Sequence, residues 1–148
     1  MTPFWKLCLD GNFDGVLAAL TRDVNHLNSC SGGDNRSGLM LALFGNHNHV
    51  VQFLLEQPSL DLNCTTVSGW TALHFAVLGD NVDGLRLLLA DPRLNTVNHK
   101  DKDSVTPVMA AVISKRLFVL RELVAHPSVD LDTRDDVGRS LEERARQR

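Results

Sequence analysis

The sequence repeats itself at an interval of 34 or 35 residues. When the chain is aligned with itself, a threonine or serine recurs at the same place in each interval, at Thr2, Ser37, Thr71, Thr106 and Ser140. A constant period of this length is typical of a solenoid, in which one small unit stacks on copies of itself because it cannot bury its apolar face alone. The repeat therefore favours one domain of stacked units.

Each interval contains two short stretches with the apolar spacing of a helix, followed by a stretch rich in turn residues. In the third interval the two helices are predicted over 72–78 and 82–90, and in the first interval a helix is predicted over 3–9. Thr2 is expected to cap this helix and Pro3 to be its first residue. A proline that cannot continue a helix follows the second helix of three intervals, at Pro58, Pro92 and Pro127.

The most regular interval contains the segment G-W-T-A-L-H-F-A at 69–76, followed by Leu85 and the run Leu87-Leu88-Leu89. This segment resembles the ankyrin repeat, G-x-T-P-L-H-x-A with a leucine-rich second helix, and the resemblance extends over nearly the whole chain. It implies an all-α ankyrin-repeat solenoid of about four helix-turn-helix repeats, with β-hairpin-like fingers and a C-terminal capping half-repeat. The repeats are expected near 2–36, 37–70, 71–105 and 106–139, with the partial cap at 140–148.

The resemblance also assigns the core and the finger tips. Gly69 and Gly138 keep the turn glycine of the family, whereas Asn35 and Ser104 replace it. In the cap, Leu141 and Ala145 are expected to face inward. Interleaved acids favour a solvated surface over a phosphate site for Arg139, Arg144, Arg146 and Arg148. The expected core comprises Leu39, Leu73, Val108, Ala42, Ala76, Ala111 and the pairs Leu54/Leu55, Leu88/Leu89 and Leu123/Val124.

Composition narrows the class of partner and the compartment. The chain has 148 residues, of which 43% are hydrophobic, and a formal net charge of -3, so no global positive field favours nucleic acid or an anionic membrane. No apolar run reaches the roughly 18 residues of a membrane span, and the N-terminus lacks the pattern of a signal peptide. Three cysteines without metal-ligand spacing indicate free thiols in a reducing compartment, the cytoplasm or the nucleus.

A protein-binding surface is predicted along the concave side, where finger tips and first helices of ankyrin proteins face a partner. The residues seven after each anchor are all large and apolar, namely Leu9, Phe44, Leu78 and Ile113. With Trp70 and Val105 they would form an apolar stripe with a polar rim, a combination that favours protein contact over packing between neighbouring fingers. The predicted binding residues are Arg36, Phe44, Ser68, Trp70, Leu78, Asp103, Val105 and Ile113, with Asp34 also on the rim.

Other chemistry is weakly indicated. His74 lies where the family uses histidine for hydrogen bonds between repeats, and no nucleophile–base or metal-ligand spacing is present, so no catalytic residue or cofactor is predicted. Cys30 and Cys64 should occupy equivalent places in adjacent fingers, too far apart for a disulfide. Asn25 and Asn63 resemble finger asparagines that an oxygen-sensing asparaginyl hydroxylase modifies.

We therefore expect a non-enzymatic interaction module, a monomer, that binds a protein or peptide. The alternatives are a scaffold or capping fragment of a larger protein whose groove is filled in cis, or a protein with an unrecognised catalytic or ligand site. A ligase receptor, a kinase inhibitor and a signalling adaptor are all compatible with such a module.

Overall fold

The structure, a computed structural model, describes residues 1–147. Arg148, which ends the predicted cap, lies outside the described residues. The described part of the chain consists of four pairs of antiparallel helices and a single final helix, joined by irregular segments, and this confirms the all-α solenoid. The helices are α1 (Phe4–Leu9), α2 (Phe13–Arg22), α3 (Gly38–Phe44), α4 (Asn48–Leu55), α5 (Ala72–Leu78), α6 (Val82–Ala90), α7 (Pro107–Ile113), α8 (Leu117–Ala125) and α9 (Leu141–Ala145), with a 3₁₀ turn η1 at Val24–Asn28.

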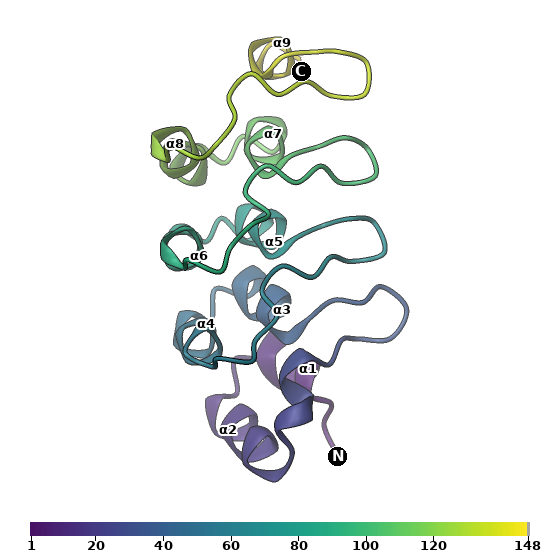
Figure 1. Cartoon of the computed structure of the whole chain (residues 1–148), viewed down its shortest axis with the longest axis vertical. Helices are drawn as coiled ribbons and strands as arrows, with labels where there is room; N and C mark the ends of the chain where they lie inside the picture. Colours follow the sequence, from purple (N-terminus) through teal and green to yellow (C-terminus); the bar gives the residue numbers. More distant parts are fainter. Residues whose placement is uncertain (148) are drawn as a thin grey trace.

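The helices form two parallel columns, and the fingers project from one of them (Figure 1). The first helices α1, α3, α5, α7 and α9 each contact the next in order, and the second helices α2, α4, α6 and α8 do the same. The fingers extend from the column of first helices, on the side away from the second helices. Side chains that line this inner side therefore come from two sources only, the finger tips and the first helices.

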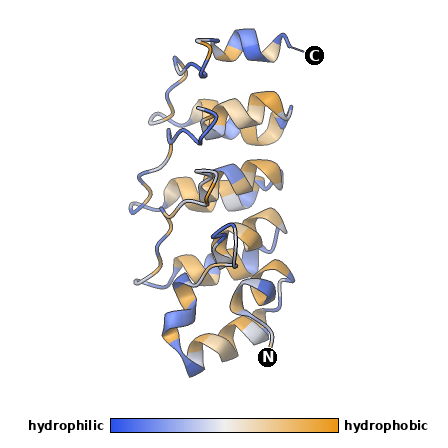
Figure 2. Ribbon diagram, turned by 90° about the vertical axis from the view of Figure 1, so that its right-hand side faces the viewer, coloured by the Kyte–Doolittle hydropathy of each residue, from blue (hydrophilic) through white to orange (hydrophobic). Residues whose placement is uncertain are grey.

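The core lies between and within the two columns. Apolar residues follow successive helices, whereas the loops and much of α9 are hydrophilic (Figure 2). All six predicted core positions on the first helices are buried, as are Leu54, Leu88 and Leu123 on the second helices. Leu55 and Leu89 are only partly buried. Val124, predicted as part of the core, is 45% exposed, and within residues 1–147 no second helix follows α8 to cover it.

The anchor residues begin the first helices, with one exception. The hydroxyls of Ser37, Thr106 and Ser140 each accept a hydrogen bond from the backbone N–H three residues later, which satisfies a donor that the first turn leaves free. The predicted cap at Thr2 is wrong. Pro3 takes the cap position with an extended backbone, and its carbonyl accepts the first helical bonds from Lys6 and Leu7.

Every finger tip turns at a residue with a positive φ angle, the two residues that replace the family glycine included: Asn35, Gly69, Ser104 and Gly138. Neighbouring fingers are joined by backbone hydrogen bonds, from the N–H of Val67 to the carbonyl of Asp34 and from the N–H of Lys102 to the carbonyl of Ser68. Within residues 1–147 strand pairing is limited to one bridge between Cys30 and Ser37, so the predicted β-hairpin character of the fingers is not confirmed.

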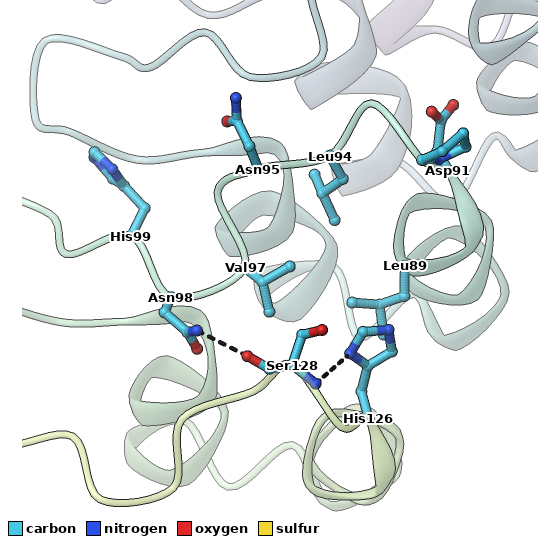
Figure 3. Close-up of a pocket in the computed structure, with 10 residues that line it drawn as sticks. Leu89, Asp91, Leu94, Asn95, Val97, Asn98, His99, His126 and Ser128 are labelled. Carbon is cyan, nitrogen blue, oxygen red and sulfur yellow. Dashed lines mark hydrogen bonds between the residues drawn. The ribbon is translucent and has the colours of Figure 1, made fainter.

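An asparagine ladder ties each connecting loop to the next. Asn28, Asn63 and Asn98 each donate their side-chain N–H to a carbonyl of the following repeat, at Ser59, Arg93 and Ser128, over 2.8 Å. Figure 3 shows the bond from Asn98 to Ser128. Asn28, and not Asn25, is therefore the structural counterpart of Asn63, because η1 adds a turn between Asp23 and the ladder position.

The final half-repeat is held by a buried carboxylate, Asp135. Its Oδ2 atom lies 2.8 Å from Nε of Arg139 and 2.9 Å from Nε of Arg144, and the side chain of Asp135 is fully buried. Burial alone would raise the pKa of Asp135, but the N–H groups of Arg139 and Val137 and the Arg139 guanidinium lower it. The expected orientation of α9 is thus partly wrong. Leu141 faces inward, but Ala145 is exposed because Arg144 takes the inner face to reach Asp135.

Candidate protein-binding surface

A cavity of about 220 Å³ opens between the second and third fingers and the helices α5 and α7. Its walls include Leu78 at the end of α5, Ile113 at the end of α7, and Val105 just before α7. The structure thus brings together five of the eight predicted binding residues. The full lining is Trp70, His74, Leu78, Asp101, Asp103, Val105, Ala110 and Ile113. We call this cavity the Trp70 pocket.

The other three predicted residues lie outside the Trp70 pocket. Arg36 lines a second hollow of about 360 Å³ beside the first finger, together with Trp5, Leu9 and Leu41. Phe44 is 47% exposed and lines neither hollow, and Ser68 is exposed at a finger tip. The residues of the predicted stripe therefore do not line one continuous groove, and most of them are divided between two hollows.

Arg36, which lines the second hollow, lies over the ring of Phe75, and Phe75 contacts Trp70 of the pocket. The guanidinium carbon of Arg36 lies 6.0 Å from the centre of the Phe75 ring, within the range of a cation–π contact. Phe75 is buried beneath this cation. The guanidinium of Arg36 also forms an ion pair with Asp34 at 2.6 Å, which fixes its position at the edge of the surface.

Trp70 is held in a defined orientation. Its indole N–H donates to Oδ2 of Asp101 over 3.1 Å, and its ring meets Phe75 edge to face, with 5.6 Å between the ring centres. The ring also stacks on His74 with the ring planes 13° apart. The side chain is half-buried, so part of it remains available to a partner. An aromatic side chain that is fixed before binding loses little conformational entropy on binding.

His74 connects α5 to the third finger, just before α7. The backbone N–H of Thr71 donates to Nδ1 over 3.1 Å, which leaves the proton on Nε2, and Nε2 donates to the carbonyl of Val105 over 2.9 Å. Burial lowers the pKa of His74 despite the opposing effect of the Val105 carbonyl, so the imidazole is neutral. Both ring nitrogens are committed to hydrogen bonds, and the histidine serves as a structural link.

We expect acidification below about pH 6.5 to destabilise the protein through His74. Because the pKa of His74 is lowered in the folded protein, the unfolded chain binds a proton that the folded chain does not. The effect is absent at higher pH, where neither state is protonated. Melting temperatures at about pH 7.5 and 5.5 should differ more in the wild type than in His74→Gln, which lacks the titrating group. An equal difference in the two proteins would contradict this assignment.

The lining residues that the sequence did not predict include Asp101 and Ala110 in the Trp70 pocket, and Trp5 and Leu41 in the second hollow. Trp5 lies three residues after its anchor Thr2, just as His74 lies three residues after Thr71. Because His74 is expected to have a structural role, this position did not indicate a binding residue. Asp101 lies five residues before its anchor, and Asp135 does the same, so the repeat alignment contains a signal for it. Ala110 carries no signal of its own, because a small apolar residue in a helix indicates only close packing.

Comparison with known proteins agrees with the fold. The sequence profile of ankyrin repeats in three copies matches residues 4–98. BTB/POZ domain-containing protein 1 of Schizosaccharomyces pombe is 32% identical over 100 residues, which are 65% of this chain and 7% of that protein. Ankyrin repeat and SAM domain-containing protein 6 of Mus musculus is 36% identical over 91 residues, 60% of this chain and 10% of that protein. The matched region is thus a tenth or less of either relative.

None of the helices between residues 1 and 147 is long and apolar enough to cross a lipid bilayer. Three observations lead to one conclusion: the stacked helix pairs, the histidine link from α5 to the third finger, and the profile match over more than half of the sequence. The chain belongs to the ankyrin-repeat family, whose members are generally non-enzymatic modules for protein–protein interaction.

Proposed function

We propose that this chain binds a protein or peptide segment along its concave surface, with the Trp70 pocket as the main contact. The observation that carries the proposal is a cavity of about 220 Å³ whose walls combine Leu78, Val105 and Ile113 with polar side chains. Ile113, which forms one wall, is 45% exposed, although a solvent-facing position of a bare stack gains nothing from an isoleucine. An apolar hollow beside a half-buried tryptophan is the usual composition of a binding hot spot.

The geometry favours a rigid mode of binding. Backbone hydrogen bonds join the first three fingers to one another, and His74 ties the wall residue Val105 to α5. A partner therefore meets walls that are already in place, and the entropy lost on binding falls mainly on the partner. Asp101 and Asp103 at this pocket also favour a polypeptide over the phosphate backbone of a nucleic acid.

Thiol chemistry at the cysteines does not compete with this proposal. Burial raises the pKa of the Cys8 thiol to about 12. Burial and the neighbouring charge of Asp61 also raise the pKa of Cys30 and of Cys64. A thiol whose pKa is raised holds little of the thiolate that acts as a nucleophile. Free thiols of this kind support the prediction of a reducing compartment, the cytoplasm or the nucleus.

Hydroxylation of Asn63 stays a proposal of lower rank than partner binding. The side chain of Asn63 donates to the carbonyl of Arg93 and accepts from the N–H of Asn95, so a modifying enzyme would have to open both bonds. Asn25 lies in the exposed η1 turn outside the ladder. Intact-mass measurement after treatment with the hydroxylase tests both asparagines.

We expect Trp70→Ala to weaken binding of the partner by at least about 2 kcal/mol, or roughly 30-fold in Kd. The partner is obtained by affinity capture with the wild type and identified by mass spectrometry, and its Kd is then measured by titration. Because Trp70 also packs against Phe75, a second variant, Ile113→Asp, places a charge on the exposed pocket wall with little effect on the core.

The matched control is Phe118→Asp, which alters an exposed aromatic residue on α8, in the other helix column from the fingers (Figure 1). Thermal melts of all three variants separate loss of binding from loss of folding. The proposal is wrong if Ile113→Asp binds the captured protein as tightly as the wild type while Phe118→Asp does not.

A further inference from the structure

The carboxylate of Asp101 in the Trp70 pocket has an equivalent one repeat further along the chain. Asp101 accepts through Oδ1 from the N–H groups of Asp103 and Val105, at 2.8 and 2.9 Å. Asp135 accepts in the same way from the N–H groups of Val137 and Arg139, at 3.1 and 2.8 Å. The two aspartates therefore organise their fingers identically, and both leave Oδ2 directed away from the finger backbone.

The two sites differ in what meets Oδ2. At Asp135 the guanidinium groups of Arg139 and Arg144 lie within 2.9 Å. The residues at the same places relative to Asp101, 34 positions earlier in the sequence, are Val105 and Ala110. Neither residue carries a charge, and both line the Trp70 pocket. The pocket therefore lies where the next repeat carries its own arginine side chains.

The charge of Asp101 is left without a cation. Oδ2 accepts one hydrogen bond from the indole N–H of Trp70, which is a neutral donor. Among residues 1–147 neither Asp101 nor Asp103 takes part in an ion pair, although both line the pocket. Asp34, which occupies the place of Asp103 in the first finger, does have a cation, since Arg36 neutralises it at 2.6 Å.

We propose that the Trp70 pocket binds an arginine side chain of the partner polypeptide. The guanidinium meets Oδ2 of Asp101 and the carboxylate of Asp103, as Arg139 and Arg144 meet Asp135 within the chain. The methylene stem lies against Leu78 and Ile113, and the adjacent Trp70 ring adds a cation–π contact. Arginine is preferred to lysine because its planar fork of donors matches carboxylates and stacks on aromatic rings. This inference rests on the proposed function.

The test uses a random peptide library displayed on phage, selected against the whole chain. We expect the recovered peptides to share an arginine at one position. Synthetic versions of one such peptide then carry arginine, lysine, citrulline or alanine at that position. Citrulline keeps the shape of the side chain and removes its charge, and we expect it to weaken binding at least about tenfold, as alanine does.

Two variants of the protein locate the arginine. Ala110→Arg recreates the arrangement at Arg144, so its own guanidinium should occupy Asp101 and abolish binding of the arginine peptide. Asp103→Asn should reduce the difference between the arginine and citrulline peptides. The matched control is Asp34→Asn, the same substitution at the equivalent finger position, which should leave that difference unchanged because Arg36 already pairs with Asp34.

The outcomes separate this inference from the proposed function. Peptides that bind in the groove without a shared arginine, or that bind equally well with citrulline, overturn the arginine pocket and leave the interaction module standing. Arginine peptides that bind Ala110→Arg and Asp103→Asn as tightly as the wild type also overturn it. Failure to recover any peptide, combined with unchanged partner binding by Ile113→Asp, contradicts both proposals.

Discussion

Gly79→Ala is expected to lower the free energy of unfolding by about 3 kcal/mol, the upper end of the range for an overpacked core. A Cβ atom at Gly79 would lie 2.7 Å from the carbonyl oxygen of Phe44 and 2.9 Å from that of Leu43. Both atoms belong to the backbone at the end of α3, so no side-chain rotation can relieve the contact. The turn after α5 would have to move away from α3, which loosens the stack at its centre.

The next repeat carries a side chain at the position that is equivalent to Gly79. Ser114 occupies the place of Gly79 at the end of α7, and α7 packs less closely on α5 than α5 packs on α3. A side chain at this place is thus compatible with the fold where the contact between the two first helices is less extensive. In Gly79→Ala the side chains between α3 and α5 are unchanged, so a displacement of the turn would leave voids between them.

Denaturant and thermal unfolding measure this effect, with Gly32→Ala as the matched control. A Cβ atom at Gly32 has no neighbour within 4 Å, so the same substitution there should change stability by less than about 0.5 kcal/mol. Equal stability of the two variants would show that α3 and α5 do not approach as closely as described.

The fold follows from the sequence because the information that determines it is local and repeated. The helices predicted over 72–78 and 82–90 have these bounds in the structure, since apolar periodicity, the anchor threonine and the following break all lie within one interval. The positive φ angle of Ser104 was predictable only by alignment with Gly69 and Gly138, because serine itself seldom adopts that conformation. The repeat alignment thus indicates a backbone conformation that the residue type alone does not indicate.

The site was only partly predictable because its contacts join residues of different repeats. The bond from Trp70 to Asp101 spans 31 positions, and the sequence pattern that places Trp70 on the binding surface does not indicate this partner. Likewise, the asparagine that bonds to the next repeat is Asn28 and not Asn25, because the η1 turn is inserted after Asp23. The motif D-V-N alone does not indicate this insertion. Such features depend on insertions and on pairwise geometry across the stack, and neither appears in a periodic pattern.

Asn81→Ala is expected to lower the free energy of unfolding by about 3 kcal/mol, through two losses of roughly 1 to 2 kcal/mol each. Asn81 caps α6, since its Oδ1 accepts from the N–H of Gly84 over 2.9 Å. Its Nδ2 donates to the carbonyl of Leu43 over 3.0 Å and to the side chain of Asn48 over 2.7 Å. Because Asn81 is 1% exposed, water cannot replace these bonds.

Asn12 provides the control, because its Oδ1 accepts from the N–H of Gly15 and so caps α2 as Asn81 caps α6. Asn12 is exposed and lies in the first repeat, which has no preceding repeat among residues 1–147 to bond to. Asn12→Ala should therefore cost only the cap, about 1 kcal/mol, when both variants are measured by denaturant unfolding. In the second repeat His47 takes this place and also reaches across the stack, to the carbonyl of Leu9 over 2.9 Å. If Asn81→Ala costs no more than Asn12→Ala, these links between repeats contribute nothing, and the rigidity that presents the Trp70 pocket must come from apolar packing alone.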